Sequence, residues 1–149
     1  MVLYIRDGRA PVPKNEQTSR TMSAIHAKNT KPELLVRKAL SSRGIRGYRL
    51  HSKKVSGRPD IVFSKQKIAI FVHGCFWHGC SYCKPNLPKT HRAFWRKKIC
   101  TNKLRDVRKT KELRKQEWRT LIVWEHETKR DPDRIALRIV KLLNSYHKD

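Results

Sequence analysis

Acidic residues are scarce in this sequence, which carries 12 Asp and Glu against 36 Lys and Arg and so a formal net charge of +24. This excess is larger than solubility requires and favours a polyanionic partner. Nucleic acid is the favoured partner, and the alternative is a merely basic, ribosome-like protein. Membrane lipid is disfavoured because the basic residues are spread over the chain instead of gathering on one amphipathic helix.

Long apolar runs are also missing, since no stretch reaches the length of a membrane-spanning helix. The first seven residues are interrupted by Arg6 and Asp7 and lack the apolar core of a signal peptide. We therefore expect a soluble, intracellular protein. The 149 residues, 38% of them hydrophobic, are enough for one domain, which we place at 18–149 after a flexible arm at 1–17.

The hydrophobic pattern predicts an α/β domain with a mixed central sheet flanked by helices. Thr30 and Glu33 form a capping box with Pro32 in the first turn, so a helix should follow and end near Gly44. Three strands, a long helix, a strand and a last helix are expected at 48–50, 60–63, 67–72, 92–117, 120–124 and 132–144. The continuous apolar run at 120–124 indicates a strand covered on both faces.

Asp60 stands out because it opens an apolar strand directly after Gly57-Arg58-Pro59. Pro59 lacks a ladder donor and biases Arg58 toward extended geometry, which can hold the Asp60 carboxylate at the sheet edge. A hard cation and a phosphate could meet it there. The alternative is an ordinary surface-turn aspartate.

The next strand runs into His73-Gly74-Cys75-Phe76-Trp77-His78, which gathers two imidazoles, a thiol and two large aromatic rings within six residues. Side chains this reactive rarely serve packing alone. Burying both Phe76 and Trp77 beside a charged phosphate would be difficult, whereas their flat faces can wedge into a base stack. Such a wedge costs least at a mispair, which gives a physical route to mismatch selectivity.

Three cysteines, Cys75, Cys80 and Cys83, have the spacing C-x4-C-x2-C, and His126 follows the last core strand. Three thiolates and one imidazole can form a closed, structural zinc site. Disulfides are the rival, but nothing indicates secretion and three clustered cysteines leave one unpaired. Cys100 falls in the predicted long helix, where we expect a small buried residue.

The motifs GRPD at 57–60, FVHGCFWH at 71–78, AFW at 93–95 and LIVWE at 121–125 resemble the very-short-patch-repair (Vsr) endonucleases over roughly residues 18–143. That family belongs to the restriction-endonuclease-like superfamily, whose usual acid-x-Lys motif is absent here. The resemblance implies that Asp60 and the Val72 carbonyl hold catalytic magnesium while His73 and His78 replace the missing acid and lysine. We assign His78 as base and His73 as a positioning group, although the two roles could be exchanged.

Further site residues follow from the same resemblance. Glu33 matches a family position near the site, with helix capping as its alternative. Trp95 would join Phe76 and Trp77 in intercalating beside the mispair, with a core anchor as its alternative. The segment 18–28, which includes Met22, resembles a helix that lies in the DNA minor groove and should become ordered on binding. The remaining histidines have no evident partner and are interpreted as surface or DNA-facing: His26, His51, His91 and His147.

The function that the resemblance implies is a magnesium-dependent cut in one strand of DNA on the 5′ side of the thymine in a T:G mispair, the product of 5-methylcytosine deamination. A monomer with structural zinc, acting on double-stranded DNA in the bacterial cytoplasm at the nucleoid, is expected. Two alternatives stay open. One is a restriction-type or other mismatch nuclease of the same fold, and the other is a non-catalytic, zinc-stabilised DNA-binding module.

Overall fold

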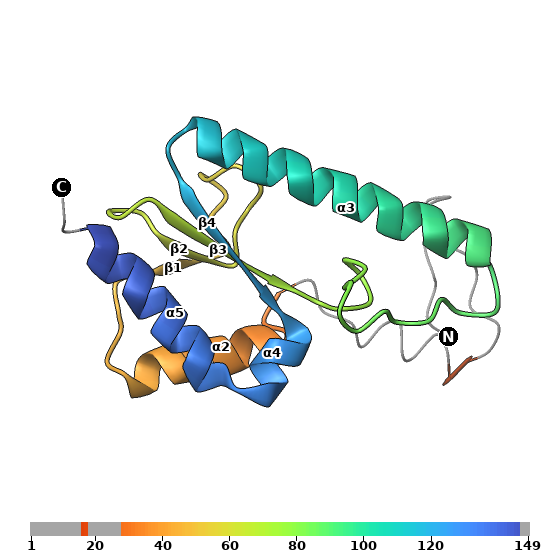
Figure 1. Cartoon of the computed structure of the whole chain (residues 1–149), viewed down its shortest axis with the longest axis horizontal. Helices are drawn as coiled ribbons and strands as arrows, with labels where there is room; N and C mark the ends of the chain where they lie inside the picture. The colour runs from red at the N-terminus through yellow and green to blue at the C-terminus, as the bar shows by residue number, and fades with distance from the viewer. Residues whose placement is uncertain (1–15, 18–27, 147–149) are drawn as a thin grey trace.

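The computed structural model describes residues 16–17 and 28–146 (Figure 1). Most of the expected arm at 1–17 and most of the expected minor-groove segment at 18–28, including Met22, lie outside these residues. The elements in chain order are α2 (Lys31–Ser42), β1 (Arg49–Leu50), β2 (Ile61–Phe63), β3 (Ile68–His73), α3 (Arg92–Lys115), β4 (Arg119–Trp124), α4 (Glu125–Arg130) and α5 (Pro132–Ser145).

Helix α2 begins as its capping box predicts. The Thr30 hydroxyl accepts the Glu33 N–H at 3.5 Å, and Glu33 reaches back to accept the Thr30 hydroxyl and the Asn29 N–H. The helix ends at Ser42, two residues before Gly44, whose φ of 70° is a conformation that favours glycine. These contacts fix Glu33 at the head of α2, where its side chain is buried.

Within the described residues, four strands form one mixed sheet in the order β1-β2-β3-β4. β2 pairs antiparallel with both β1 and β3, and β3 pairs parallel with β4. The parallel pair needs a crossover, which α3 supplies. The carboxyl ends of β3 and β4 therefore meet at one edge of the sheet, beside the amino end of β2.

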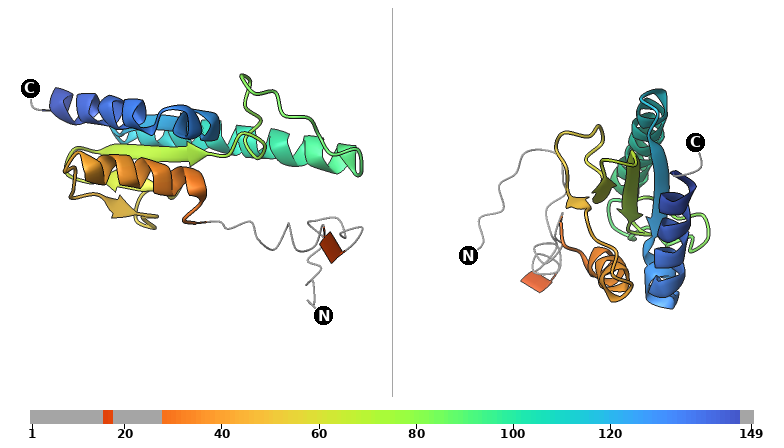
Figure 2. Two further views of the ribbon diagram at one scale, coloured as in Figure 1. Left: turned by 90° about the horizontal axis from the view of Figure 1, so that it is seen from below. Right: turned by 90° about the vertical axis from the view of Figure 1, so that its left-hand side faces the viewer.

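Alternating side chains give the sheet two buried faces. Ile61 and Ile70 belong to a core shared with α2 and α5, whereas Val62 and Phe71 pack on the other face with Leu113 of α3. Figures 1 and 2 show the same arrangement, with α2, α4 and α5 on one side of the sheet and α3 along the other. The fold is thus an α/β sandwich, as the sequence predicts.

Several details differ from the sequence-based expectations. β4 is an edge strand, and Val123 is its only fully buried residue. The expectation that the apolar run at 120–124 is covered on both faces is therefore wrong. The short helix α4 was not expected between β4 and α5. Arg58 has a φ of 49° and is not extended, because its N–H closes a turn onto the Val55 carbonyl at 3.1 Å.

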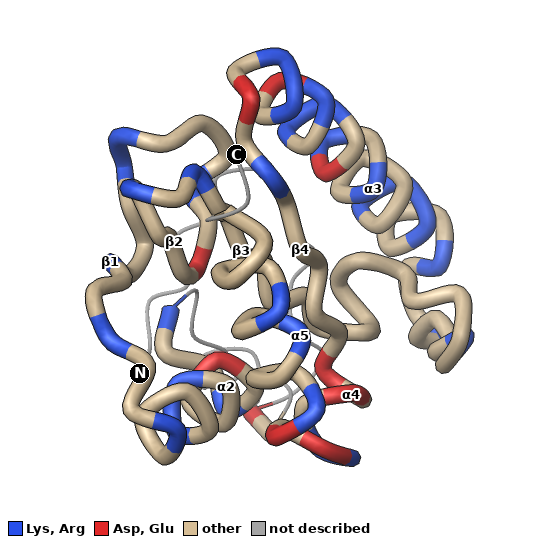
Figure 3. The backbone as a smooth tube through the Cα atoms, turned by 60° about the vertical axis from the view of Figure 1, so that its left-hand side comes forward, with Lys and Arg blue, Asp and Glu red and all other residues tan. Residues whose placement is uncertain are grey.

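Charge is unevenly distributed over the elements. Figure 3 shows Lys and Arg along α3, whereas Asp and Glu group at α4 and the adjoining start of α5. The basic helix therefore gives one side of the molecule a surface suited to a phosphate backbone. In the described part of the chain, no helix is both long enough and apolar enough to cross a membrane.

The contact between α3 and the sheet generates a stability prediction. Leu113→Ala should lower the free energy of unfolding by about 2–5 kcal/mol, because it leaves a cavity beside the strands. Leu104→Ala on the same helix is a matched control, since Leu104 is 63% exposed and Leu113 is fully buried. Urea denaturation would measure both, and equal losses would contradict the packing described.

Candidate active site

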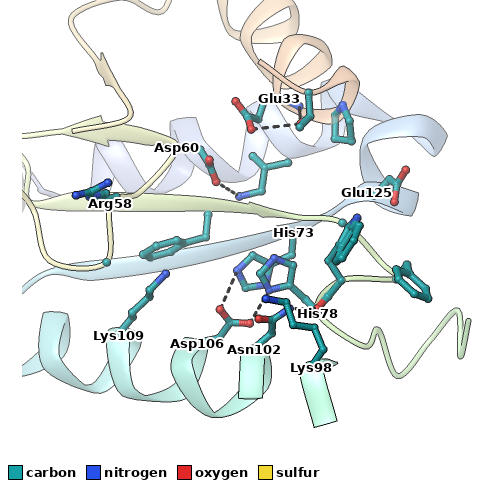
Figure 4. A pocket seen from close by; sticks show the side chains of 18 residues that line it. Glu33, Arg58, Asp60, His73, His78, Lys98, Asn102, Asp106, Lys109 and Glu125 are labelled. Atoms are coloured by element: carbon teal, nitrogen blue, oxygen red, sulfur yellow. Dashed lines mark hydrogen bonds and ion pairs between the residues drawn. The ribbon is translucent and has the colours of Figure 1, made fainter. Parts of the chain in front are cut away.

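An open cleft of about 730 Å³ lies at the edge of the sheet where β3 ends (Figure 4). Its walls come from the head of α2, the turn before β2, the end of β3 with the following loop, the inner side of α3 and the first residue of α4. Ionisable residues line it from all of these segments: Glu33, Arg58, Asp60, His73, His78, Lys98, Asp106, Lys109 and Glu125. Ligands commonly bind at such a position in α/β sheets.

Asp60 is held at this edge by the strand pairing. Its N–H donates to the Ile70 carbonyl at 2.9 Å, and its carboxylate accepts the Val72 N–H at 2.7 Å. Because β2 pairs with β3 only as far as Ile61, the Val72 N–H is free of β2 and available to this side chain. Asp60 and Val72 consequently lie side by side in the cleft wall.

Glu33 and His51 surround the Asp60 carboxylate. His51 Nε2 lies 3.2 Å from Glu33 Oε2, within ion-pair distance but without hydrogen-bond geometry, and Nδ1 lies 3.8 Å from Asp60 Oδ1. Burial raises the pKa of Asp60 to about 6, and the nearby Glu33 charge acts in the same direction, while the Val72 N–H opposes it. The three side chains bring their ligand atoms within 4.8 Å of one another, a spacing that can hold a cation.

His73 and His78 form a second group with Asp106 of α3. The two imidazole rings stack with centroids 3.8 Å apart and planes 5° apart. Asp106 Oδ2 lies 2.6 Å from His78 Nδ1, and Asp106 Oδ1 lies 3.9 Å from His73 Nε2 (Figure 4). One carboxylate thus contacts both rings.

Electrostatics distinguishes the members of this group. Burial lowers the pKa of His73 to about 4, and the adjacent His78 acts in the same direction, so His73 is neutral at neutral pH. Burial alone would raise the pKa of Asp106, but its hydrogen bond with His78 and the charges of His78, His73 and Lys109 together outweigh burial and leave the pKa below the ordinary value. Asp106 is therefore ionised at neutral pH and can accept a hydrogen bond from His78 Nδ1.

The cysteine and histidine cluster predicted from the sequence is present. Cys75 follows β3, His126 lies in α4 directly after β4, and Cys80 and Cys83 come from the intervening loop. His126 Nδ1 is 3.4 Å from Cys75 Sγ and 3.6 Å from Cys80 Sγ, while Cys83 Sγ is 3.7 Å from Cys75 Sγ. All four cysteines of the chain are free thiols in the structure, and this arrangement of donors fits a tetrahedral metal.

Burial raises the pKa of the Cys75 thiol to about 12, so a thiolate at this place requires a neighbouring cation. The Cys75 N–H donates to Glu125 Oε2 at 3.1 Å, which ties the cluster to the cleft wall through consecutive residues of α4. The cluster and the cleft are therefore neighbouring sites joined by short segments.

Phe76, Trp77 and Trp95 form an aromatic cluster at the end of the cleft. Trp95 contacts both other rings edge-on, with centroids 5.5 Å from Phe76 and 5.7 Å from Trp77. Trp95 is buried, which agrees with the alternative that it anchors the core. Phe76 and Trp77 are half-buried and line the cleft. A Cβ at Gly74 would lie 3.3 Å from Trp77 Cδ1, so the absence of a side chain at this position leaves room for the indole.

The structure brings Glu33, Asp60, Val72, His73 and His78 into the cleft, as the sequence-based hypothesis required. Two further residues contact this site without a signal in the sequence. His51, expected at the surface or facing DNA, has a side chain that is only 15% exposed.

The second of these residues, Asp106, is one of several charged residues along α3, and only the three-dimensional contact with His78 distinguishes it. Cys100 is exposed, so the expectation of a buried residue is wrong. His91 is exposed, as expected.

The raised pKa of Asp60 generates a prediction about stability and pH in the absence of divalent cations. The folded state favours neutral Asp60, so its stabilising contribution is complete below about pH 4 and is lost as the pH rises through about 6. Asp60→Asn keeps an acceptor for Val72 without the charge. It should raise the free energy of unfolding by about 1–3 kcal/mol at pH 8 and change it little at pH 4.

Urea denaturation in a metal chelator at the two pH values would measure this difference. Glu112→Gln removes an exposed carboxylate of α3 and should change stability by less than about 0.5 kcal/mol at both. An Asp60→Asn variant no more stable than the parent at pH 8 would contradict the assignment.

Comparison with known proteins agrees with this geometry. A family model described as DNA mismatch endonuclease Vsr matches residues 11–84. The type II nicking enzyme V.NmeAIP of Neisseria meningitidis is 48% identical over 108 residues, which cover 72% of this chain and 76% of the relative. The DNA mismatch endonuclease Vsr of Escherichia coli is 37% identical over 107 residues, which cover 72% of this chain and 68% of the relative.

Among solved structures, the catalytic domain of the homing endonuclease I-Bth0305I is similar, with a TM-score of 0.55 and 24% sequence identity. The match covers 80% of this chain and 100% of that domain, and it supports the fold alone. The identity to the curated relatives carries the assignment of family. On the basis of this identity, the chain belongs to the Vsr family of DNA endonucleases.

Proposed function

We propose that this protein nicks one DNA strand on the 5′ side of the thymine in a T:G mispair. The observation that carries the proposal is the convergence of Asp60, His73 and His78 on one open cleft, with Phe76 and Trp77 beside them. The family supplies the reaction class, a DNA endonuclease, and the E. coli relative is named for action at DNA mismatches. The net charge of +24 suits the polyanionic substrate.

A magnesium ion fits the acidic side of the cleft. Asp60 and the Val72 carbonyl are the proposed ligands, and the raised pKa of Asp60 means that a cation would stabilise its ionised form. Magnesium accepts few protein ligands and keeps several waters, so this small set is sufficient. When bound, the ion would polarise the scissile phosphate. Glu33 and His51 would hold the Asp60 carboxylate in place from behind.

His78 is the proposed general base. With its Nδ1 proton donated to Asp106, its Nε2 can take a proton from the attacking water, and Asp106 stabilises the imidazolium that results. The water oxygen then bonds to phosphorus as the bond to the 3′ oxygen of the preceding nucleotide breaks. His73, kept neutral by burial, stacks on His78 and fixes the plane of its ring.

Mismatch selectivity is assigned to the aromatic residues of the cleft. Trp95 is anchored in the protein and supports Phe76 and Trp77, whose half-buried rings are the ones available to enter a base stack. Unstacking is least costly at a mispair, so the same rings favour a T:G site over a paired one. We propose that Met22, outside the described residues, contacts the DNA from the minor groove.

Zinc is the metal that we propose for the cluster whose ligands are Cys75, Cys80, Cys83 and His126. Its role would be structural, since four protein donors leave no open position for substrate. The ion would join the end of β3 to α4 and fix the loop that carries Phe76 and Trp77.

A second function, a restriction-type nicking activity, is favoured by the names of several relatives. V.NmeAIP is called a type II nicking enzyme, as is V.XorIIP of Xanthomonas oryzae, which is 45% identical over 106 residues covering 71% of this chain and 77% of the relative. Both functions use the same cleft and the same reaction.

The central prediction is that the purified protein with magnesium nicks a T:G duplex faster than the matched T:A duplex. Asp60→Ala should abolish nicking while DNA binding persists, because the carboxylate serves the chemistry and the basic surface supplies affinity. Gel assays of single-strand breaks and binding would measure both. Equal nicking of both duplexes would remove the mismatch function, and unchanged nicking by Asp60→Ala would remove the proposed site.

Metal analysis of the purified protein should find about one zinc per chain. Cys80→Ser should lower that content and destabilise the fold, because a buried ligand is lost from the cluster. Cys100→Ser is the matched control and should leave both unchanged, since Cys100 is exposed on α3. Reduced, zinc-free protein with the stability of the parent would refute a structural metal.

A further inference from the structure

One face of α3 points into the cleft. Asn102, Asp106, Lys109 and Leu113 recur at intervals of three or four residues, so they lie along the same side of the helix. Leu113 packs on the sheet, Asp106 contacts His78, and the Asn102 amide donates to the Trp77 carbonyl at 2.8 Å. Since Lys109 lies between Asp106 and Leu113, it is directed to the same cleft, and Figure 4 shows its side chain rising from α3 toward the strands.

The backbone at Gly57 packs closely against the aliphatic part of the Lys109 side chain. A Cβ at Gly57 would lie 3.0 Å from both Cγ and Cδ of Lys109, and Gly57 has a φ of 80° that favours glycine. The turn before Asp60 therefore packs directly on the lysine. Lys109 also borders a small void with Phe71, His73 and Asp106, so its methylenes are packed while its ammonium remains at the cleft.

The charge of Lys109 acts on the groups assigned to the reaction. Burial is the largest influence on the pKa of Asp60, His73 and Asp106, and the charge of Lys109 acts in addition to lower each pKa. Within the described part of the chain Lys109 forms no ion pair, whereas Lys67 and Lys129 each do. Its charge is therefore available to an anion entering the cleft.

We propose that Lys109 is a catalytic residue that contacts the scissile phosphate from the α3 side, opposite the Asp60 wall. The inference rests on the proposed function and adds a substrate contact to it. A phosphodiester approaching Asp60 and Asp106 meets two carboxylates, and a fixed ammonium offsets their repulsion. As charge builds on the phosphate oxygens in the transition state, the same ammonium stabilises it.

The first test compares Lys109→Met with Lys111→Met in single-turnover nicking of a duplex that the parent protein cuts. Lys111 is two residues away, about 200° around the helix, exposed and outside the cleft. Lys109→Met should slow the chemical step about 100-fold, and Lys109→Arg should restore part of the rate. With the protein in saturating excess over the duplex, a loss of affinity from the basic helix does not affect the rate, and Lys111→Met should stay within about twofold of the parent. Equal rates for the two methionine variants would overturn the proposal.

The second test measures binding and needs no cleavage. A methylphosphonate placed at the linkage 5′ of the mispaired thymine removes one negative charge, and affinities are compared with the unmodified duplex in a metal chelator. The substitution should weaken binding of the parent and of Lys111→Met by about 10-fold and leave Lys109→Met unaffected. An equal penalty in all three proteins would overturn the contact. Because the assay requires no nicking, it decides the role of Lys109 even if the proposed mismatch cleavage fails.

Discussion

The hydrogen bond from the Val72 N–H to the Asp60 carboxylate is the contact on which the site depends. It links the start of β2 to the end of β3 over a sequence separation of 12 residues, with a donor–acceptor distance of 2.7 Å. It stabilises the ionised carboxylate in a place where burial opposes ionisation. The other groups of the cleft are arranged around this fixed point.

The parallel pairing of β3 with β4 provides the rest of the framework. His73 pairs in register with Trp124, so the residues that follow the two strands leave the sheet together. This places Cys75 near His126 and gives the Cys75 N–H a partner in Glu125. One pair of strands thus positions both the strand end that carries His73 and the cluster of cysteines with His126.

Much of this arrangement was predictable from local sequence. The capping box at Thr30 sets the start of α2, and the alternation in β2 and β3 sets their two faces. The cysteine spacing identified the thiol cluster because a metal site has a fixed set of donors and short loops between them. Asp60 was found because acidic residues are few and this one begins an apolar strand.

The remainder depends on contacts between distant segments. Asp106 and Lys109 belong to a helix full of charged residues, and only its docking through Leu113 shows which side faces the cleft. His51 follows β1 with a φ of 47°, and that backbone conformation directs its ring toward Glu33 and Asp60. Neither the docking of α3 on the sheet nor the backbone conformation at His51 can be recognised from the neighbouring sequence.

Gly74 sets a limit on how this site could be redesigned. Its Cα faces the indole of Trp77, and the carboxylate of Glu125 lies 3.9 Å from the place of an added Cβ. A lysine grafted there to recreate the acid-x-Lys motif would crowd the indole from its Cβ onward. Trp77 and a longer side chain at position 74 therefore compete for the same space, and in this architecture α3 brings a cation, Lys109, to the cleft.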